Sequence, residues 1–124
     1  MNTEDMLDCP KCAGKMETVT MGGVEVDRCA MCRGIWFDAA ECMELKAVRD
    51  CEQVDDGSPF IGSLKDGKQN IDCPVCNVRM VSFEPPNKQR DFKLERCPQC
   101  KGMFFDAGEF TDFSLDKSFW DSLK

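Results

Sequence analysis

Eight of the ten cysteines in this chain lie in four Cys-x-x-Cys motifs. The motifs form two pairs, with 16 residues between Cys12 and Cys29 and 20 residues between Cys76 and Cys97. Two Cys-x-x-Cys motifs at about this separation are typical of a zinc site with four thiolate ligands. The sequence therefore predicts two structural zinc ions. The four motifs are Cys9–Cys12, Cys29–Cys32, Cys73–Cys76 and Cys97–Cys100.

The length of the chain supports a role for metal in folding. Its 124 residues are enough for one ordinary domain or two very small ones. A unit of roughly 40 residues buries too little apolar surface to fold without a metal or disulfides. The polar, acidic start Met1–Asp5 is unlike a secretory signal peptide, and no run of about 18 apolar residues suggests a membrane span. We expect a cytoplasmic protein, in which paired cysteines bind metal rather than form disulfides.

The charge of the chain is acidic and unevenly distributed. The formal net charge is -7, which argues against strong nonspecific binding to nucleic acid. Residues 1–62 hold 6 Lys and Arg against 13 Asp and Glu, whereas residues 63–124 hold 10 of each. Contact with a polyanion is therefore more plausible in the second half.

The composition also bears on catalysis. The chain has no histidine, so the commonest general base and the Cys–His and Ser–His nucleophile pairs are missing. A catalytic zinc keeps an open coordination position, which a closed four-cysteine site does not offer. We therefore expect a protein that is not an enzyme.

The two halves of the sequence repeat each other. Each half reads Cys-Pro-x-Cys, a hairpin, a second Cys-x-x-Cys, a basic residue and glycine, an aromatic strand, and then Asp-x-x-Glu. Gly22 and Gly23 predict a two-residue hairpin turn. Gly34 and Gly102 follow the second motifs, where we expect a positive φ. The expected strands are 16–21, 24–28 and 35–37 in the first repeat, and 92–96 and 103–105 in the second.

A short helix should follow each aromatic strand. Asp38 with Glu41, and Asp106 with Glu109, resemble a capping box and predict helices over about 39–49 and 107–113. The fold class is thus a small, metal-stabilised β-rich protein: two tandem zinc ribbons, each with three short antiparallel strands and a short helix. The expected domains are residues 1–49, a linker over 50–71, and residues 72–124.

The large apolar residues have two interpretations. We expect the aromatic strands to form a miniature core, although one ring of each pair could face a partner. Leu115, Phe119 and Leu123 share one face of a C-terminal helix beside Trp120, which would pack on its own ribbon or dock a partner. Cys42 and Cys51 lie outside the motifs. If one helix ran through both, they would lie on opposite faces, with Cys42 as a small core residue.

The motif Cys-x-x-Cys-[Arg/Lys]-Gly-x-[Trp/Phe]-Phe-Asp-x-[Gly/Ala]-Glu, preceded by Cys-Pro-x-Cys, occurs twice. It resembles the prokaryotic zinc-ribbon family named for the zinc finger of transcription factor IIB, over roughly residues 8–48 and 72–113. The resemblance implies a rubredoxin-like knuckle ribbon with one zinc ion in each repeat. The first repeat departs from the pattern at Ala40 and Cys42. The implied ligands are Cys9, Cys12, Cys29 and Cys32 in the first repeat, and Cys73, Cys76, Cys97 and Cys100 in the second.

The sequence leaves several functions open. We expect an interaction module, associated with transcription, whose partner would be RNA polymerase, another protein or a nucleic acid. Lys88, Arg90 and Lys93 in the second hairpin are the best local basic group for nucleic acid. One alternative is electron transfer by iron, because rubredoxins also use two Cys-x-x-Cys motifs. Another is a thiol redox or chaperone role of the cysteine pairs.

Overall fold

The computed structural model describes residues 7–12, 14–38, 41–58, 60–62, 71–83 and 94–115. The first repeat contributes three strands and a helix, and the second repeats that order after a short 3-10 helix, η2. None of the helices in these ranges has the length and apolar character needed to span a membrane. The elements are β1 (Met16–Met21), β2 (Val24–Cys29), β3 (Ile35–Phe37), α1 (Glu41–Lys46), η2 (Cys51–Val54), β4 (Val81–Phe83), β5 (Leu94–Arg96), β6 (Met103–Phe105) and α3 (Glu109–Leu115).

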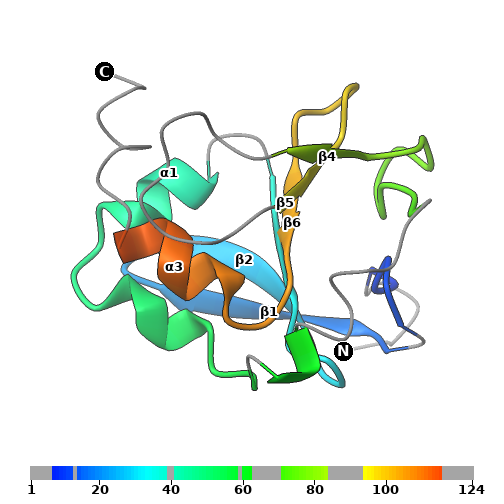
Figure 1. Cartoon of the computed structure of the whole chain (residues 1–124). Helices are drawn as coiled ribbons and strands as arrows, with labels where there is room; N and C mark the ends of the chain where they lie inside the picture. Colours follow the sequence, from blue (N-terminus) through cyan, green and yellow to red (C-terminus); the bar gives the residue numbers. More distant parts are fainter. Residues whose placement is uncertain are drawn as a thin grey trace.

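All six strands form one antiparallel sheet, in the order β1-β2-β3-β6-β5-β4 (Figure 1). The central pair β3 and β6 comes from different repeats, with Trp36 opposite Phe104 in the register. The β-rich fold class with two ribbons is therefore confirmed, and the two ribbons share a sheet. The domain limits 1–49, 50–71 and 72–124 remain a prediction, but strands from both outer segments belong to this sheet.

The local elements follow the sequence pattern closely. Strand β1 turns into β2 through Gly22 and Gly23, whose φ angles are 58° and 83°. These left-handed values suit a two-residue hairpin, because its twist matches that of the flanking strands. Met21 pairs directly with Val24, which confirms the predicted hairpin.

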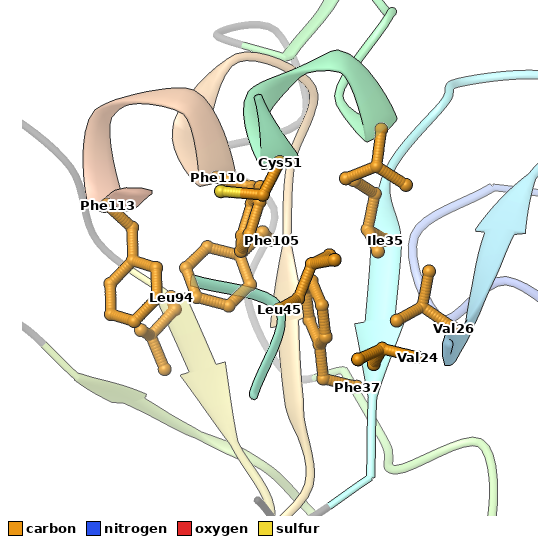
Figure 2. Close-up of a cluster of buried hydrophobic side chains, with 11 residues drawn as sticks. Val24, Val26, Ile35, Phe37, Leu45, Cys51, Leu94, Phe105, Phe110 and Phe113 are labelled. Carbon is orange, nitrogen blue, oxygen red and sulfur yellow. The ribbon is translucent and has the colours of Figure 1, made fainter. Parts of the chain in front are cut away.

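Alternation along the strands divides the buried residues into two clusters. Side chains two residues apart share a face, so Ile35 and Phe37 lie on one face and Trp36 on the other. The first face packs against the helices, where the ring centroids of Phe37 and Phe110 are 5.0 Å apart (Figure 2). The second face carries the knuckles. Both faces of β3 are buried, and no aromatic side chain of β3 or β6 is exposed. Trp36, Phe37, Phe104 and Phe105 are therefore core residues.

The two glycines after the second knuckles have a different purpose from the one predicted. The positive φ angles belong to the preceding residues, Arg33 (64°) and Lys101 (68°), and not to Gly34 and Gly102. A β-carbon on Gly34 would overlap the ring of Phe104, and one on Gly102 would overlap the ring of Trp36. Each glycine therefore makes room for the aromatic ring of the other repeat, a tertiary contact that sequence reasoning missed.

We expect Gly102→Ala to destabilise the fold by about 1–3 kcal/mol, because it overpacks the contact with the Trp36 ring. Thermal or urea unfolding would measure the loss. Trp36→Leu removes the ring atoms that overlap, so the two substitutions together should cost less than the sum of their separate effects. Strict additivity of the two effects would contradict the contact.

The segment after α1 connects the repeats. It begins with η2, in which Cys51 and Val54 are buried in the cluster beneath the helices. Helix α1 ends at Lys46, so no single helix runs through Cys42 and Cys51. Asp55 then accepts hydrogen bonds from the backbone N–H groups of Gly108 (2.8 Å) and Thr111 (2.9 Å) at the start of α3. A residue of the predicted linker thus caps the helix of the second repeat.

Removal of this cap by Asp55→Ala should cost about 1–2 kcal/mol of stability. The Asp55 carboxylate also accepts a hydrogen bond from the Thr111 hydroxyl at 3.0 Å, so three donors lose their acceptor together. Denaturant unfolding measures the change. The neighbouring Asp56→Ala, which removes the partly exposed ion pairs with Arg28 and Arg33, should cost no more than about 1 kcal/mol. An equal loss for both variants would refute the capping role.

Several predictions concern residues outside the described ranges. They include the end of the C-terminal helix with Phe119, Trp120 and Leu123, and the basic residues Lys88, Arg90 and Lys93. The side chain of Cys42 is likewise outside the description. Helix α1 begins at Glu41 and α3 at Glu109, each with its backbone N–H bonded to the carbonyl of the preceding Asp38 or Asp106.

Candidate metal centres

The structure brings the eight knuckle cysteines together in two groups of four. Within each group all four Sγ atoms lie within 4.8 Å of one another. The Sγ atoms of Cys9 and Cys32 are 3.7 Å apart, and those of Cys73 and Cys100 are 3.8 Å apart. Four sulfurs around a tetrahedral zinc ion, each at about 2.3 Å, lie about 3.8 Å from one another. Each group can therefore hold one zinc ion, as the sequence predicts.

Backbone N–H groups point at the sulfurs in both groups. In the first, the N–H groups of Met31 and Cys32 donate to Cys29 Sγ at 3.3 and 3.4 Å. In the second, the N–H groups of Gln99 and Cys100 donate to Cys97 Sγ at 3.4 Å each. Donors aimed at sulfur stabilise the thiolate, which is the form that binds metal. The second knuckles of the two repeats are therefore built alike.

The pKa values of the thiols are spread within each group. A hydrogen bond from the Cys9 thiol lowers the pKa of Cys32 to about 5, and the same contact raises the pKa of Cys9. Burial raises the pKa of Cys73 to about 12. Burial also opposes ionisation of Cys97, but hydrogen bonds from the N–H groups of Cys100 and Gln99, together with those from the Cys100 and Cys73 thiols, outweigh it and lower the pKa to about 7. Metal binding must therefore displace protons, so affinity should rise with pH.

A buried cluster of charges joins the first knuckle to the second repeat. Lys11, between Cys9 and Cys12, is fully buried, and its Nζ lies 2.5 Å from carboxylate oxygens of Glu95 and of Asp106. Burial alone lowers the pKa of Lys11, but the two carboxylates outweigh it and raise the pKa. Nothing in the sequence pattern except its place in a knuckle distinguishes Lys11 from an ordinary surface lysine. Lys11 holds the first metal centre against the strands of the second repeat.

The equivalent position in the second knuckle carries Val75, which is half exposed, so the acids at the equivalent strand positions have no such lysine. These acids are Asp27 and Asp38. Burial raises the pKa of Asp27, and the nearby charge of Asp38 raises it further. When the pKa of a carboxyl group is higher in the folded than in the unfolded protein, the protein loses stability as the pH rises above the unfolded pKa. The first repeat therefore carries an electrostatic cost near neutral pH.

We accordingly expect Asp27→Asn to stabilise the protein at pH 7 by on the order of 0.5 kcal/mol, because solvent screens much of the repulsion. The gain should shrink as the pH falls, because protonation of the Asp27 carboxyl group removes the repulsion in the folded protein. Thermal unfolding at several pH values measures both effects. Glu44→Gln makes the same change of formal charge at an exposed site on α1, and it should give no comparable gain. A gain for Asp27→Asn that does not depend on pH would refute the assignment.

The surface beside the first metal centre is apolar. Met31 and Phe60 are about two thirds exposed, at 68% and 69%, and Ile61 is exposed as well. Ile61 and Met31 line a cavity of about 190 Å³ together with Cys12 and Cys32. An apolar surface thus adjoins two of the predicted ligands.

Comparison with known proteins agrees with the geometry. A family model described as a transcription factor zinc-finger matches residues 8–48 and 72–113, which is one match for each repeat and two thirds of the chain together. Neither the comparison with curated proteins nor that with solved structures returned a match. Each matched region contains one complete group of four cysteines. The chain therefore belongs to the transcription factor zinc-finger family of zinc ribbons.

Proposed function

We propose that this protein is a non-enzymatic, zinc-stabilised interaction module that acts in association with transcription. The observation that carries the proposal is the pair of four-cysteine groups in one sheet. Four thiolates close the coordination sphere of a zinc ion, so the metal would stabilise the fold and not act on a substrate. The eight knuckle cysteines would be the ligands.

The surface supports a role in binding. Met31, Phe60 and Ile61 are exposed apolar side chains beside the first metal centre. Exposed apolar side chains that lie close together mark sites of protein interaction more often than isolated ones do. The family description supports the link to transcription.

A pull-down with the tagged, zinc-loaded protein from lysate of the source organism tests the proposal. The experiment is run with and without nuclease, and captured proteins are identified by mass spectrometry. RNA polymerase subunits that persist after nuclease would support a direct role in transcription. Loss of all partners after nuclease would instead favour nucleic acid, and Lys88, Arg90 and Lys93 would then be the first residues to reverse in charge.

A matched variant makes the pull-down specific. Met31→Ser with Ile61→Ser removes apolar surface beside the first metal centre without touching a cysteine. Both side chains are exposed, so the fold should remain intact. The same partners at the same yield with this variant would exclude the surface as the docking site.

A further inference from the structure

Two arginines of the first repeat, Arg28 and Arg33, bind an acidic segment of the chain itself. Arg28 on β2 and Arg33 after the second knuckle both approach Asp56, with shortest distances of 3.3 and 2.9 Å. Arg33 also makes a second, parallel hydrogen bond to Asp56, from Nε at 3.0 Å. Glu17 on β1 lies opposite Arg28 in the register and 3.4 Å from Arg33. Two cations thus face two carboxylates.

The second repeat keeps the cations, but in its described residues no carboxylate takes the place of Glu17 or Asp56. Arg96 and Lys101 stand at the positions of Arg28 and Arg33, and Lys101 has nearly the same positive φ as Arg33, 68° against 64°. The residue opposite Arg96 in the register is Val81, where the first repeat has Glu17 opposite Arg28. The surface of the second repeat is therefore more positive than its counterpart.

The Arg96 side chain lies against Phe83 of the edge strand β4. Its guanidinium lies over the ring of Phe83, 5.9 Å from the centroid, and among the described residues its buried Nε, like that of Arg28, has no hydrogen-bond partner. Val81 is half exposed on the edge strand β4. Lys101 is exposed, and its Nζ donates to the Pro98 carbonyl at 2.9 Å. Within the described ranges, neither Arg96 nor Lys101 forms a salt bridge with an acid.

The first repeat shows which groups pair with an arginine at this position of the ribbon. The segment that covers Arg28 accepts a hydrogen bond at the carbonyl of Val54 (3.0 Å) and pairs through the carboxylate of Asp56. Among residues 71–83 and 94–115, no aspartate or glutamate forms a salt bridge with Arg96 as Asp56 does with Arg28. A ligand that carries a carboxylate would complete the same pairing in the second repeat.

We propose that Arg96 and Lys101, with the apolar side chains of Val81 and Phe83, form a docking site for an acidic peptide segment of a partner protein. The segment would carry an apolar residue two positions before an aspartate, as Val54 precedes Asp56. Its carboxylate would pair with the two cations, and its apolar side chain would lie on β4. The inference rests on the proposed interaction function and names the chemistry of the partner.

The test is an NMR titration of the zinc-loaded, ¹⁵N-labelled chain with a synthetic peptide, Glu-Gln-Val-Asp-Asp-Gly, which copies residues 52–57. We expect shifts of the Val81 amide and the Arg96 Nε–H signal. The affinity should be weak and should fall as salt is raised. A peptide with both aspartates changed to asparagine should bind at least about fivefold more weakly, since its ion pairs are lost.

Variants of the protein locate the site. Arg96→Gln with Lys101→Gln should weaken binding of the aspartate peptide by a similar factor. The matched control, Lys15→Gln with Arg49→Gln, removes the same charge from exposed positions of the first repeat and should bind normally. Val81→Glu introduces the counterpart of Glu17, so it should occupy the two cations internally and abolish binding without loss of stability.

The site would be overturned by no shift at Arg96, by equal binding of the asparagine peptide, or by contacts between Arg96 and residues 116–124 in the free protein. Stronger shifts of the same signals by a short oligoribonucleotide would also overturn it, in favour of nucleic acid. The outcome is separable from the proposed function. Partners still captured by the Arg96 and Lys101 variant would leave the interaction function intact and exclude this site. Peptide binding by a protein that captures no partner would support this site and contradict the proposed interaction function.

Discussion

Replacement of Cys29 by serine is expected to remove one zinc ion per chain and to unfold the shared sheet. Cys29 is fully buried, and its sulfur accepts two backbone hydrogen bonds. Zinc contributes on the order of 10–16 kcal/mol to the folding of small zinc-finger peptides, which exceeds the stability of an ordinary domain. Because β3 pairs with β6, loss of the first metal centre should also disorder the second repeat.

Metal analysis and circular dichroism measure the two effects. Native protein should contain two zinc ions per chain, one for each group of four cysteines, and Cys29→Ser one or none. The control is Cys51→Ala, which removes a buried cysteine outside both groups and should keep both ions. A red protein that contains iron would contradict the zinc assignment and favour electron transfer. Retention of both zinc ions by Cys29→Ser would exclude Cys29 as a ligand.

Lys11→Met should have the second-largest effect, a loss of about 3–5 kcal/mol. The substitution leaves the carboxylates of Glu95 and Asp106, which are 7% and 2% exposed, without the ammonium group that lies 2.5 Å from each. An uncompensated buried charge is costly because neither water nor a counterion replaces the lost partner. The variant should recover stability as the pH falls, since protonation of the carboxylates removes the charge.

Two controls separate the cost of losing the buried charge of Lys11 from the cost of losing any lysine side chain. Lys15→Met breaks an ion pair with Asp8 in the same knuckle, but both side chains are exposed, so the expected cost is about 0–1 kcal/mol. The triple variant Lys11→Met, Glu95→Gln, Asp106→Asn neutralises the whole cluster and should regain much of the loss. Urea unfolding at constant zinc concentration measures all three. Equal losses for Lys11→Met and Lys15→Met would show that burial of the charge is unimportant.

Local patterns in the sequence predicted the metal centres and most of the strands. Cys-x-x-Cys spacing specifies a knuckle over a few residues, and Gly22 with Gly23 specifies a turn, so neither depends on the rest of the fold. Strand β1 has the bounds expected from the sequence, as do β3 and β6. The helices are shorter or shifted by two residues, because helix ends depend on the packing of their last turns.

The contacts between the repeats were not predictable in this way. Lys11 is a long charged residue in a loop, which sequence patterns place in solvent, and its burial depends on acids 84 and 95 positions away along the chain. Asp55 and Asp56 look like solvated linker residues, yet Asp55 caps α3 and Asp56 pairs with Arg33. Each of these roles needs a partner from a distant segment, so only the tertiary structure reveals it.

The pairing of β3 with β6 arranges the two repeats like the two subunits of a symmetric dimer, joined here in one chain. Trp36 and Phe104 are equivalent residues and lie opposite each other, so an approximate two-fold axis passes between them. A strand edge that pairs with its own copy is the geometry of a symmetric homodimer. Because the two halves are joined in one chain, their sequences need not be identical, so the first knuckle carries Lys11 where the second carries Val75. The two repeats thus give one sheet two unlike surfaces.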